Sequence, residues 1–172
     1  MKGPAKGSSS TPASKILTER QIPFRLATFP SQEKDAEEVS RSLKIPLRQV
    51  VKTLLLKAPA RGFLLVLCPG NRQVDLRRLA QLLQEKQVEM AARDEVHKIT
   101  GYFIGGVSPL GTRRELPILM DASVLSEKEI AISAGRWGQQ ILLDPHLLRE
   151  LLHPRLTVAD ISQERGPSAR TP

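Results

Sequence analysis

The segment at residues 50–57, with the sequence VVKTLLLK, constrains the fold of this chain more than any other segment. Alternate residues of a β-strand face opposite sides of the sheet, and here both sides would be largely apolar. A strand of this kind is typical of a sheet that is covered on both faces. We therefore expect residues 50–57 to form a strand with other elements packed on both of its sides.

Lys52 is the exception within this strand, because the residues two positions away on either side are apolar. Its ammonium group must reach solvent, meet an anion or lose its charge. One interpretation is an edge lysine that protects the sheet from aggregation. The other is an ammonium directed into a pocket where a phosphate or ester oxygen arrives. The strand pattern leaves both open.

Glycines and apolar residues are concentrated in residues 100–121, which read TGYFIGGVSPLGTRRELPILMD. Surface loops usually carry more charge than this segment does before Arg113. Glycine lacks a Cβ atom, so a glycine-rich backbone can approach another group closely. The segment is therefore either a tight turn between core strands or a pocket wall that offers backbone N–H groups to an oxygen-rich ligand.

Short helices and short strands alternate along the rest of the chain. Thr11 followed by Pro12 predicts a helix start, and Asp75, Asp94 and Asp144 predict three more. Further helical segments are expected at residues 35–43 and 126–128. The expected strands lie at residues 24–29, 62–67, 88–91, 116–121, 130–133 and 139–143, the last two as a hairpin. Arg72, Arg77 and Arg78 are expected on the outer face of the helix that follows Asp75.

The length of 172 residues suits one domain, which we place at residues 11–160. Residues 1–10 are expected to form a disordered tail and residues 161–172 a loose C-terminal tail.

The net charge of +8 suggests a polyanionic partner, although solubility alone would also account for it. Cys68 is the only cysteine and lies in an apolar run, which predicts a buried thiol and a reducing, cytoplasmic location. No segment has the length of a membrane span.

Several common catalytic motifs are missing. The chain has no GxxxxGK[ST], GxSxG or HExxH segment and no paired cysteine ligands. His97 has no second ligand-type residue at useful spacing, so no metal and no organic cofactor is expected. If the protein is an enzyme, we expect it to act by positioning and backbone polarisation rather than through a nucleophilic side chain.

Seven segments, in unbroken order, resemble the YbaK family of trans-editing aminoacyl-tRNA deacylases, and within it the bacterial Cys-tRNA(Pro) deacylases. The resemblance covers about residues 11–160, and its two specific pieces are KTLLL and the glycine-rich segment. The matching segments are TPASKIL, QVVKTLLL, PG…VDLRRLA, VEMA, TGYFIGGVSPLG, LPILMD and ISAGRWG.

The resemblance implies a single α/β domain, mixed α+β, with a curved, barrel-like mixed β-sheet flanked by helices. It implies release of a mischarged amino acid from tRNA(Pro), cysteine most of all, with Lys52 as the catalytic residue. The implied release is either hydrolytic, by a hydrolase, or cyclising. In Cys-specific members the substrate's own thiol attacks its ester, so no protein nucleophile is needed and the enzyme is formally a lyase. The implied substrate-binding residues are Phe29, Thr53, Gly105, Gly106, Ser108, Pro109, Gly111, Ser133, Gly135 and Gln140.

Two positions depart from the family's pattern, and both bear on amino-acid specificity. Phe29 stands where related members often carry tyrosine, and Gln140 stands where an acidic residue is expected. A deacylase with alanine or serine specificity is therefore an alternative, and so is a catalytically weak module that binds a tRNA 3′ end or a synthetase. The expected partners are mischarged tRNA(Pro) and prolyl-tRNA synthetase, and the expected oligomeric state is a monomer.

Overall fold

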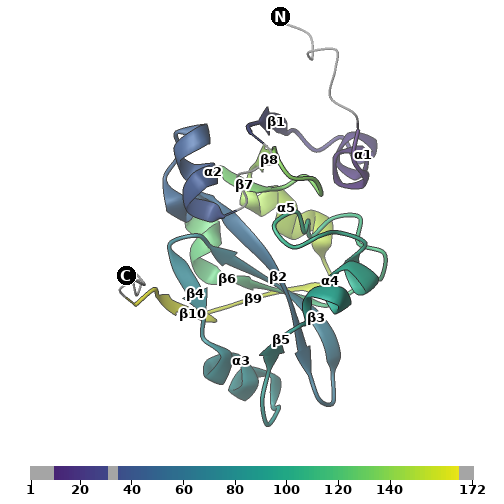
Figure 1. The fold of residues 1–172 in the computed structure, drawn as a ribbon, viewed down its shortest axis with the longest axis vertical. Helices are drawn as coiled ribbons and strands as arrows, with labels where there is room; N and C mark the ends of the chain where they lie inside the picture. Colours follow the sequence, from purple (N-terminus) through teal and green to yellow (C-terminus); the bar gives the residue numbers. More distant parts are fainter. Residues whose placement is uncertain (1–9, 31–34, 167–172) are drawn as a thin grey trace, which may run out of the picture.

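The computed structural model describes residues 10–30 and 35–166. An antiparallel hairpin of β2 (Val51–Ala58) and β3 (Gly62–Pro69) runs through the middle of the molecule (Figure 1). The hairpin is extended on both sides into a mixed sheet with the order β5-β2-β3-β6-β9, in which β6 and β9 run parallel to β3. The added strands are β5 (Glu89–Met90), β6 (Ile118–Asp121) and β9 (Leu156–Ala159).

A second, antiparallel sheet has the order β1-β8-β7. Its strands are β1 (Arg25–Thr28), β7 (Ile130–Ser133) and β8 (Gln139–Leu143), and the hairpin predicted at residues 130–143 is confirmed. A parallel bridge between Val50 and Ala131 joins this sheet to the start of β2. The predicted single α/β domain with a mixed sheet is confirmed, although the sheets do not close into a barrel within the described residues.

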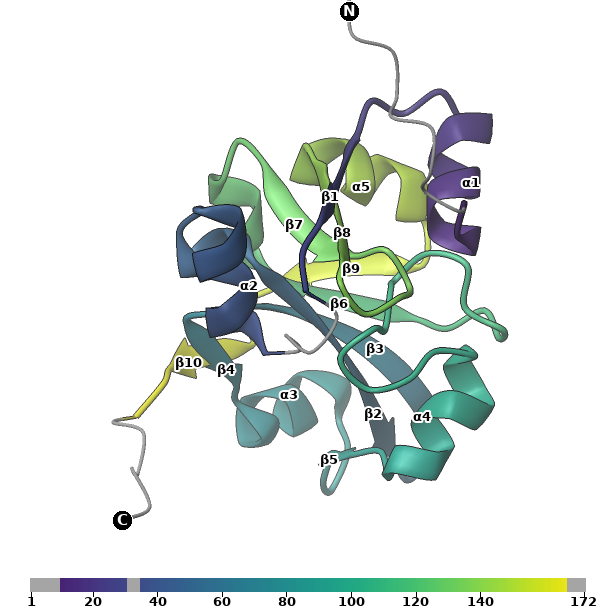
Figure 2. The same ribbon diagram turned by 45° about the horizontal axis from the view of Figure 1, so that its top comes forward.

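Helices cover both faces of the β2–β3 hairpin, as the two apolar sides of residues 50–57 predict. Val51 and Leu55 belong to a large core shared with α1 (Pro12–Glu19), α4 (Arg93–Thr100) and α5 (Pro145–Leu152). Leu56 belongs to a second core under α3 (Leu76–Leu83). Figure 2 shows α3 on the opposite side of the hairpin from α1 and α5. α2 (Ala36–Leu43) packs on Val50 in a third, smaller cluster.

Local signals explain where most helices begin. Thr11 caps α1 in a reciprocal arrangement with Ser14, and Asp75 and Asp144 cap α3 and α5 as predicted. The predicted cap at Asp94 is wrong: α4 begins at Arg93, and Asp94 lies in its first turn. The Glu95 carboxylate accepts the Ala92 N–H at 2.7 Å, so the preceding backbone is already held without Asp94.

Two 3₁₀ helices complete the fold, η1 (Leu47–Gln49) and η2 (Ala122–Ser126). The helical turn predicted at residues 126–128 therefore lies further towards the N-terminus. The reason is the Asp121 carboxylate, which accepts the Ser123 N–H at 3.1 Å and starts the turn directly after β6. Among the described residues, no helix has the length and apolar character needed to cross a bilayer.

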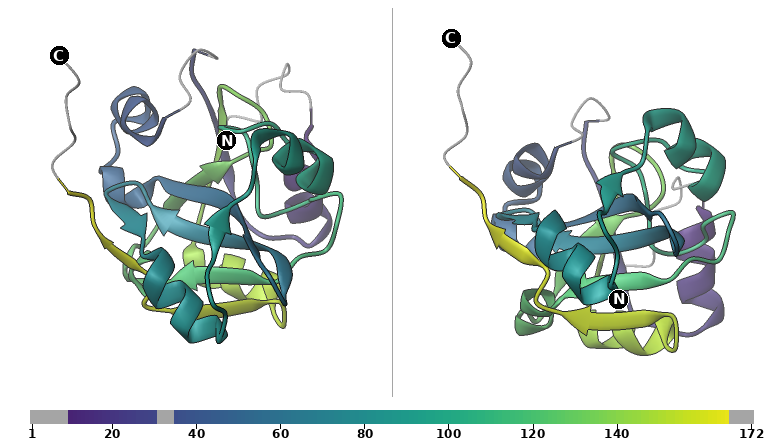
Figure 3. Two further views of the ribbon diagram at one scale, coloured as in Figure 1. Left: turned by 60° about the horizontal axis from the view of Figure 1, so that its bottom comes forward. Right: turned by 90° about the horizontal axis from the view of Figure 1, so that it is seen from below.

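The fold continues past the boundary predicted at residue 160. Ile161 is fully buried, and β10 (Ser162–Glu164) pairs antiparallel with β4 (Arg72–Val74). Figure 3 shows this C-terminal strand running along the edge of the molecule beside β4. Arg72 accordingly lies in a strand, not on the outer face of α3 as predicted. Of the tails predicted at residues 1–10 and 161–172, residues 1–9 and 167–172 lie outside the described residues.

Candidate functional site

A cavity lies along a stretch of the β2 edge that no neighbouring strand of the described residues covers. β3 pairs with one edge of β2 throughout, whereas the other edge carries only the bridge at Val50 and the β5 pairing at Leu56 and Lys57. Between them lies a cavity of about 280 Å³, bounded by α2, β2, β7, β8 and the glycine-rich loop. Its lining residues are Asp35, Ala36, Glu37, Val39, Val50, Val51, Lys52, Thr53, Leu54, Ile104, Gly105, Val107, Ser133, Gln140 and Arg165.

Lys52 lines this cavity and is half-buried. Its Nζ atom donates to the carbonyl oxygen of Arg72 at 2.8 Å. An ammonium group has three donors, so the carbonyl uses only part of its capacity. Burial lowers the pKa of Lys52, with a further lowering from Arg165, while Cys68 and Glu37 act in the opposite direction. Of the two interpretations, the placement favours an ammonium that faces a pocket over one that guards a free edge.

Thr53 follows Lys52 in β2 and contributes a buried hydroxyl group whose hydrogen bonding is incomplete. The Thr53 Oγ1 atom is inaccessible to solvent and has no hydrogen-bond partner among the described residues. Buried hydroxyl groups in folded proteins almost always form hydrogen bonds, and each exception calls for an explanation. Thr53 lines the cavity, so a rotation of its side chain would bring the hydroxyl to a polar atom of a bound ligand.

The glycine-rich loop forms one wall of the cavity through Ile104, Gly105 and Val107. Gly105 has a φ angle of +86°, a conformation that residues with a Cβ atom rarely adopt. Gly106 follows it without lining the cavity, and its N–H donates to the Phe103 carbonyl at 2.8 Å. The loop is thus both a tight turn and a pocket wall, and the two interpretations of its sequence are compatible.

Two further predicted residues lie side by side in the cavity wall. Ser133 of β7 and Gln140 of β8 are cross-strand partners, and both line the cavity. The Ser133 hydroxyl accepts the Gly135 N–H at 3.2 Å. Phe29 lies behind this wall, where it packs against the small cluster of Ala36, Val39 and Val50.

Four other predicted substrate-binding residues lie within or against the glycine-rich loop and do not line the cavity: Ser108, Pro109, Gly111 and Gly135. Gly111 and Gly135 surround Tyr102: a Cβ atom on Gly135 would lie 2.5 Å from the Tyr102 ring, and one on Gly111 would lie 2.8 Å from Pro12. The Tyr102 hydroxyl donates to the Leu110 carbonyl at 2.7 Å. Ser108 and Pro109 are buried within the loop. Contact of these residues with a substrate stays a prediction.

Glu37 and Arg165 at the rim were missed by the sequence analysis. Arg165 Nη1 forms an ion pair with Glu37 and also donates to the Gly70 carbonyl at 3.3 Å. Burial would raise the pKa of Glu37, but the hydrogen bond from Arg165, a backbone hydrogen bond and the nearby charges of Arg165 and Lys52 lower it. The pair joins residues from opposite ends of the chain, and no local pattern signals such a contact.

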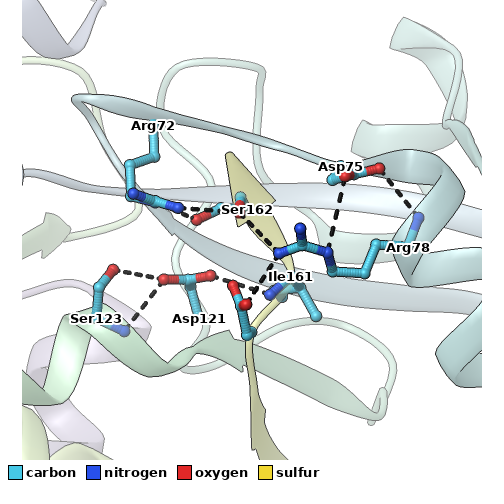
Figure 4. A network of polar contacts seen from close by, with 8 residues as sticks. Arg72, Asp75, Arg78, Asp121, Ser123, Ile161 and Ser162 are labelled. Carbon is cyan, nitrogen blue, oxygen red and sulfur yellow. Dashed lines mark hydrogen bonds and ion pairs between the residues drawn. The ribbon is translucent and has the colours of Figure 1, made fainter. Parts of the chain in front are cut away.

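Figure 4 shows a network of polar contacts that ties the C-terminal segment to Asp121 and Arg72, and the Arg72 carbonyl extends it to Lys52. The buried Asp121 carboxylate accepts the Ile161 N–H at 3.1 Å and holds Ser162 through its side chain. Arg72 donates to the Ser162 hydroxyl at 2.6 Å and to its carbonyl at 3.0 Å. The carbonyl of the same arginine accepts from Lys52. The C-terminal strand therefore positions both the backbone that holds the lysine and the arginine at the rim.

Cys68 is the cross-strand partner of Lys52 but is not equipped to be a nucleophile. The side chain is fully buried, and burial raises the pKa of its thiol to about 11 despite the nearby charge of Lys52. The predicted buried cysteine is confirmed. In the described part of the chain, no group of three or more His, Cys, Asp and Glu side chains is placed to hold a metal ion.

Comparison with known proteins gives concordant matches. The model of the aminoacyl-tRNA editing domain family matches residues 30–151. EbsC of Enterococcus faecalis, described as a candidate Cys-tRNA(Pro)/Cys-tRNA(Cys) deacylase, is 31% identical over 148 residues, which are 85% of this chain and 90% of that protein. The proline–tRNA ligase of Bacillus licheniformis is 37% identical over 103 residues, or 60% of this chain, but the match covers only 18% of the ligase.

Two solved structures are similar over almost their whole length. The hypothetical protein APE2540 superposes with a TM-score of 0.80 and 26% identity, covering 87% of this chain and 97% of that structure. A candidate trans-editing enzyme for prolyl-tRNA synthetase superposes with a TM-score of 0.79 and 26% identity, covering 92% of this chain and all of that one.

Proposed function

Since the chain belongs to the aminoacyl-tRNA editing domain family, we propose that it removes mischarged cysteine from tRNA(Pro) in trans. Membership makes it an aminoacyl-tRNA deacylase; the amino acid, the tRNA and the mechanism are the parts that we propose. The observation that carries the proposal is the convergence of the Lys52 ammonium, the unpartnered Thr53 hydroxyl and the Gly105 backbone on one small cavity.

The cavity chemistry suits an aminoacyl ester at a tRNA 3′ end. The Lys52 ammonium would stabilise negative charge that develops on the ester oxygen, and the Thr53 hydroxyl, once turned towards the cavity, would add a second donor. Val50, Val51 and Val107 supply apolar surface for the aminoacyl side chain. A volume of about 280 Å³ is sufficient for a small amino acid.

The reaction that we propose uses the substrate's own thiol. The cysteine thiolate attacks the ester carbon, a C–S bond forms, the C–O bond to the terminal ribose breaks and the ribose oxygen takes up a proton. The products are a cyclic thiolactone and free tRNA, so the enzyme is formally a lyase. Among the residues that line the cavity there is no cysteine or histidine, which agrees with a reaction that needs no protein nucleophile.

The testing experiment measures deacylation of tRNA(Pro) charged with cysteine, alanine or serine. We expect cysteine to be released fastest, and Lys52→Ala to lower kcat/KM by about 100-fold or more, as for loss of one preorganised donor. Lys57→Ala is the matched control, because Lys57 lies on the same strand outside the cavity, where it pairs with Glu89 and Glu95. Exposed ion pairs contribute little to stability, so this control should fold and keep its activity.

Undiminished turnover in Lys52→Ala would exclude the role assigned to this lysine. Faster release of alanine or serine would move the specificity away from cysteine, and Gln140 and Phe29 are then the residues to exchange. Binding of tRNA with no ester cleavage above background would instead establish a catalytically weak binding module. Mass spectrometry of the released product separates a thiolactone from free cysteine.

We further propose that the protein works beside prolyl-tRNA synthetase in the cytoplasm. The support is that proline–tRNA ligases carry a related segment that makes up less than a fifth of their length. A free-standing relative of that segment would meet the same tRNA after its release from a synthetase. Co-elution of the protein with the synthetase and tRNA(Pro), dependent on the tRNA, is the expected result.

A further inference from the structure

An exposed aromatic patch lies beside the cavity. Phe103 is 61% exposed and Trp137 is 41% exposed, although the whole chain has only one Trp, one Tyr and four Phe residues. The other four are buried or packed against a core: Tyr102, Phe24, Phe29 and Phe63. A chain so poor in aromatic residues would gain core stability by burying these two. Their joint exposure at one place is typical of a binding surface.

The exposed rings are held in a fixed arrangement. The rings of His97 and Phe103 are stacked, with centroids 4.2 Å apart and planes inclined by 6°. Trp137 lies across Phe103 at 6.2 Å and 51°, and its indole N–H donates to the Ile104 carbonyl at 3.0 Å. His97, Phe103 and Trp137, which we call the aromatic platform, come from α4, the glycine-rich loop and the β7–β8 turn. His97 covers one face of Phe103, and the large exposed fraction belongs to the rest of that ring.

The aromatic platform is continuous with the cavity wall. Ile104, whose carbonyl holds Trp137, lines the cavity together with Gly105. The next residue, Gly106, donates its N–H to the Phe103 carbonyl, and its α-carbon faces the indole ring so closely that a Cβ atom would lie 3.4 Å from Trp137. A ligand that fills the cavity and extends past Gly105 would therefore reach the exposed rings directly.

Basic side chains belong to the same three segments as the platform. Lys98 follows His97 in α4, Arg136 precedes Trp137, and Arg113 donates to the Lys98 carbonyl at 3.1 Å. Exposed aromatic rings beside basic residues are the usual means of holding single-stranded nucleic acid: the bases stack on the rings, and the cations attract the phosphates. Stacking of this kind tolerates any base, since every base has a π face.

We propose that the aromatic platform stacks an unpaired base of the tRNA 3′ end, next to the aminoacylated nucleotide that enters the cavity. This inference rests on the proposed function, which supplies the RNA. The platform then sets the direction in which the single-stranded end leaves the cavity. It also accounts for the exposure of Phe103, which is 61% exposed although it contacts both His97 and Trp137.

Trp137 makes the proposal directly measurable, because it is the only tryptophan in the chain. The probe is an uncharged RNA hairpin with a single-stranded 3′ overhang, compared with the same hairpin without the overhang. We expect the overhang to quench the fluorescence of Trp137 in the full-length protein and the blunt hairpin to leave it largely unchanged. Equal quenching by both hairpins would overturn the proposal.

Phe103→Leu tests the stacking itself, because leucine keeps the apolar surface and removes the ring. We expect KM for aminoacyl-tRNA and Kd for the overhang hairpin each to rise about tenfold, with kcat unchanged, as for loss of one stacked base. Phe103→Tyr keeps a ring and should restore wild-type values. Leu82→Ala is the control, since Leu82 is 49% exposed on α3, away from the cavity.

The outcomes separate this inference from the proposed function. Wild-type Kd and KM in Phe103→Leu would overturn the platform and favour a patch that contacts a protein, while leaving the deacylase proposal in place. A wild-type protein that releases no amino acid, yet binds the overhang through Phe103, would contradict the deacylase proposal and support the platform.

Discussion

At the scale of single residues, the neighbours Lys52 and Cys68 show how burial decides the chemistry of the site. They face each other across β2 and β3, and an ammonium beside a thiolate would be a stable pair. Burial instead raises the pKa of the thiol to about 11, so the cysteine is uncharged at neutral pH. The positive charge of Lys52 is therefore not neutralised by Cys68. It remains available to an anionic or polar group that enters the cavity.

Thr53→Val is expected to separate stability from activity. Valine keeps the β-branched shape of threonine and removes the buried hydroxyl that has no partner among the described residues. An unsatisfied buried polar group costs about 1–3 kcal/mol, so the melting temperature should stay unchanged or rise. Deacylation should fall, because the proposed ligand loses a donor. Thermal unfolding and kcat/KM measure the two effects, and a variant that loses stability while keeping full activity contradicts this role.

Sequence patterns pointed to residues in the cavity wall more clearly than to the residues at its rim. Lys52 stood out because a charge in an apolar strand needs a reason, and Gly105 because glycines cluster around it. Arg165 and Glu37 gave no such signal, since each looks like an ordinary surface residue until the fold brings them together. For Gly111 and Gly135, the structure places Tyr102 and Pro12 where a Cβ atom would lie, and their contact with a ligand stays a prediction.

At the scale of elements, local signals located most helices and the longer strands, and distant pairing determined the rest. β2 was recognisable from its own eight residues, and the β7–β8 hairpin from the turn between its strands. β4, β9 and β10 have three or four residues each and weak patterns. β10 forms because Ile161 is buried and the Asp121 carboxylate holds its backbone, a contact across 40 residues that no local window contains.

Asp121→Asn should weaken this anchoring in a pH-dependent way. Burial raises the pKa of Asp121, but hydrogen bonds from Ser123, Ser162 and the Ile161 N–H outweigh it and lower the pKa below its usual value of 3.8. A lowered pKa in the folded state stabilises the protein above the unfolded value. That contribution is lost as the pH falls through the folded value, which lies below 3.8.

The expected loss of unfolding free energy for Asp121→Asn is roughly 2 kcal/mol at pH 7, the usual effect of hydrogen bonds to a charged group. The difference from the wild type should shrink as the pH drops below about 4, where the carboxyl group protonates in the unfolded chain, and should be lost once it also protonates in the folded protein. Denaturant unfolding at pH 7 and pH 2.5 measures both values. A difference that is equal at the two pH values would show that the charge of Asp121 does not matter.

At the scale of the whole molecule, the net charge of +8 suits the proposed RNA substrate, which is negatively charged. Contacts between basic side chains and phosphates release bound counterions, so binding weakens as salt increases. We expect KM for aminoacyl-tRNA to rise steeply between about 50 mM and 200 mM salt, while kcat, which reflects the cavity, changes little. A KM that is independent of salt would mean that the charge serves solubility alone. Uncharged tRNA as a competitive inhibitor, assayed over the same salt range, provides the control.

The C-terminal strand also has a consequence for how the protein becomes active during its synthesis. Lys52 is held by the carbonyl of Arg72, and Arg72 is held by Ser162, which leaves the ribosome 90 residues later. The β2–β3 hairpin can therefore form early, but its lysine acquires a fixed position only when β10 docks. A nascent chain that presents the editing cavity has already folded through Ile161. We therefore expect deacylation to require the docked C-terminal strand.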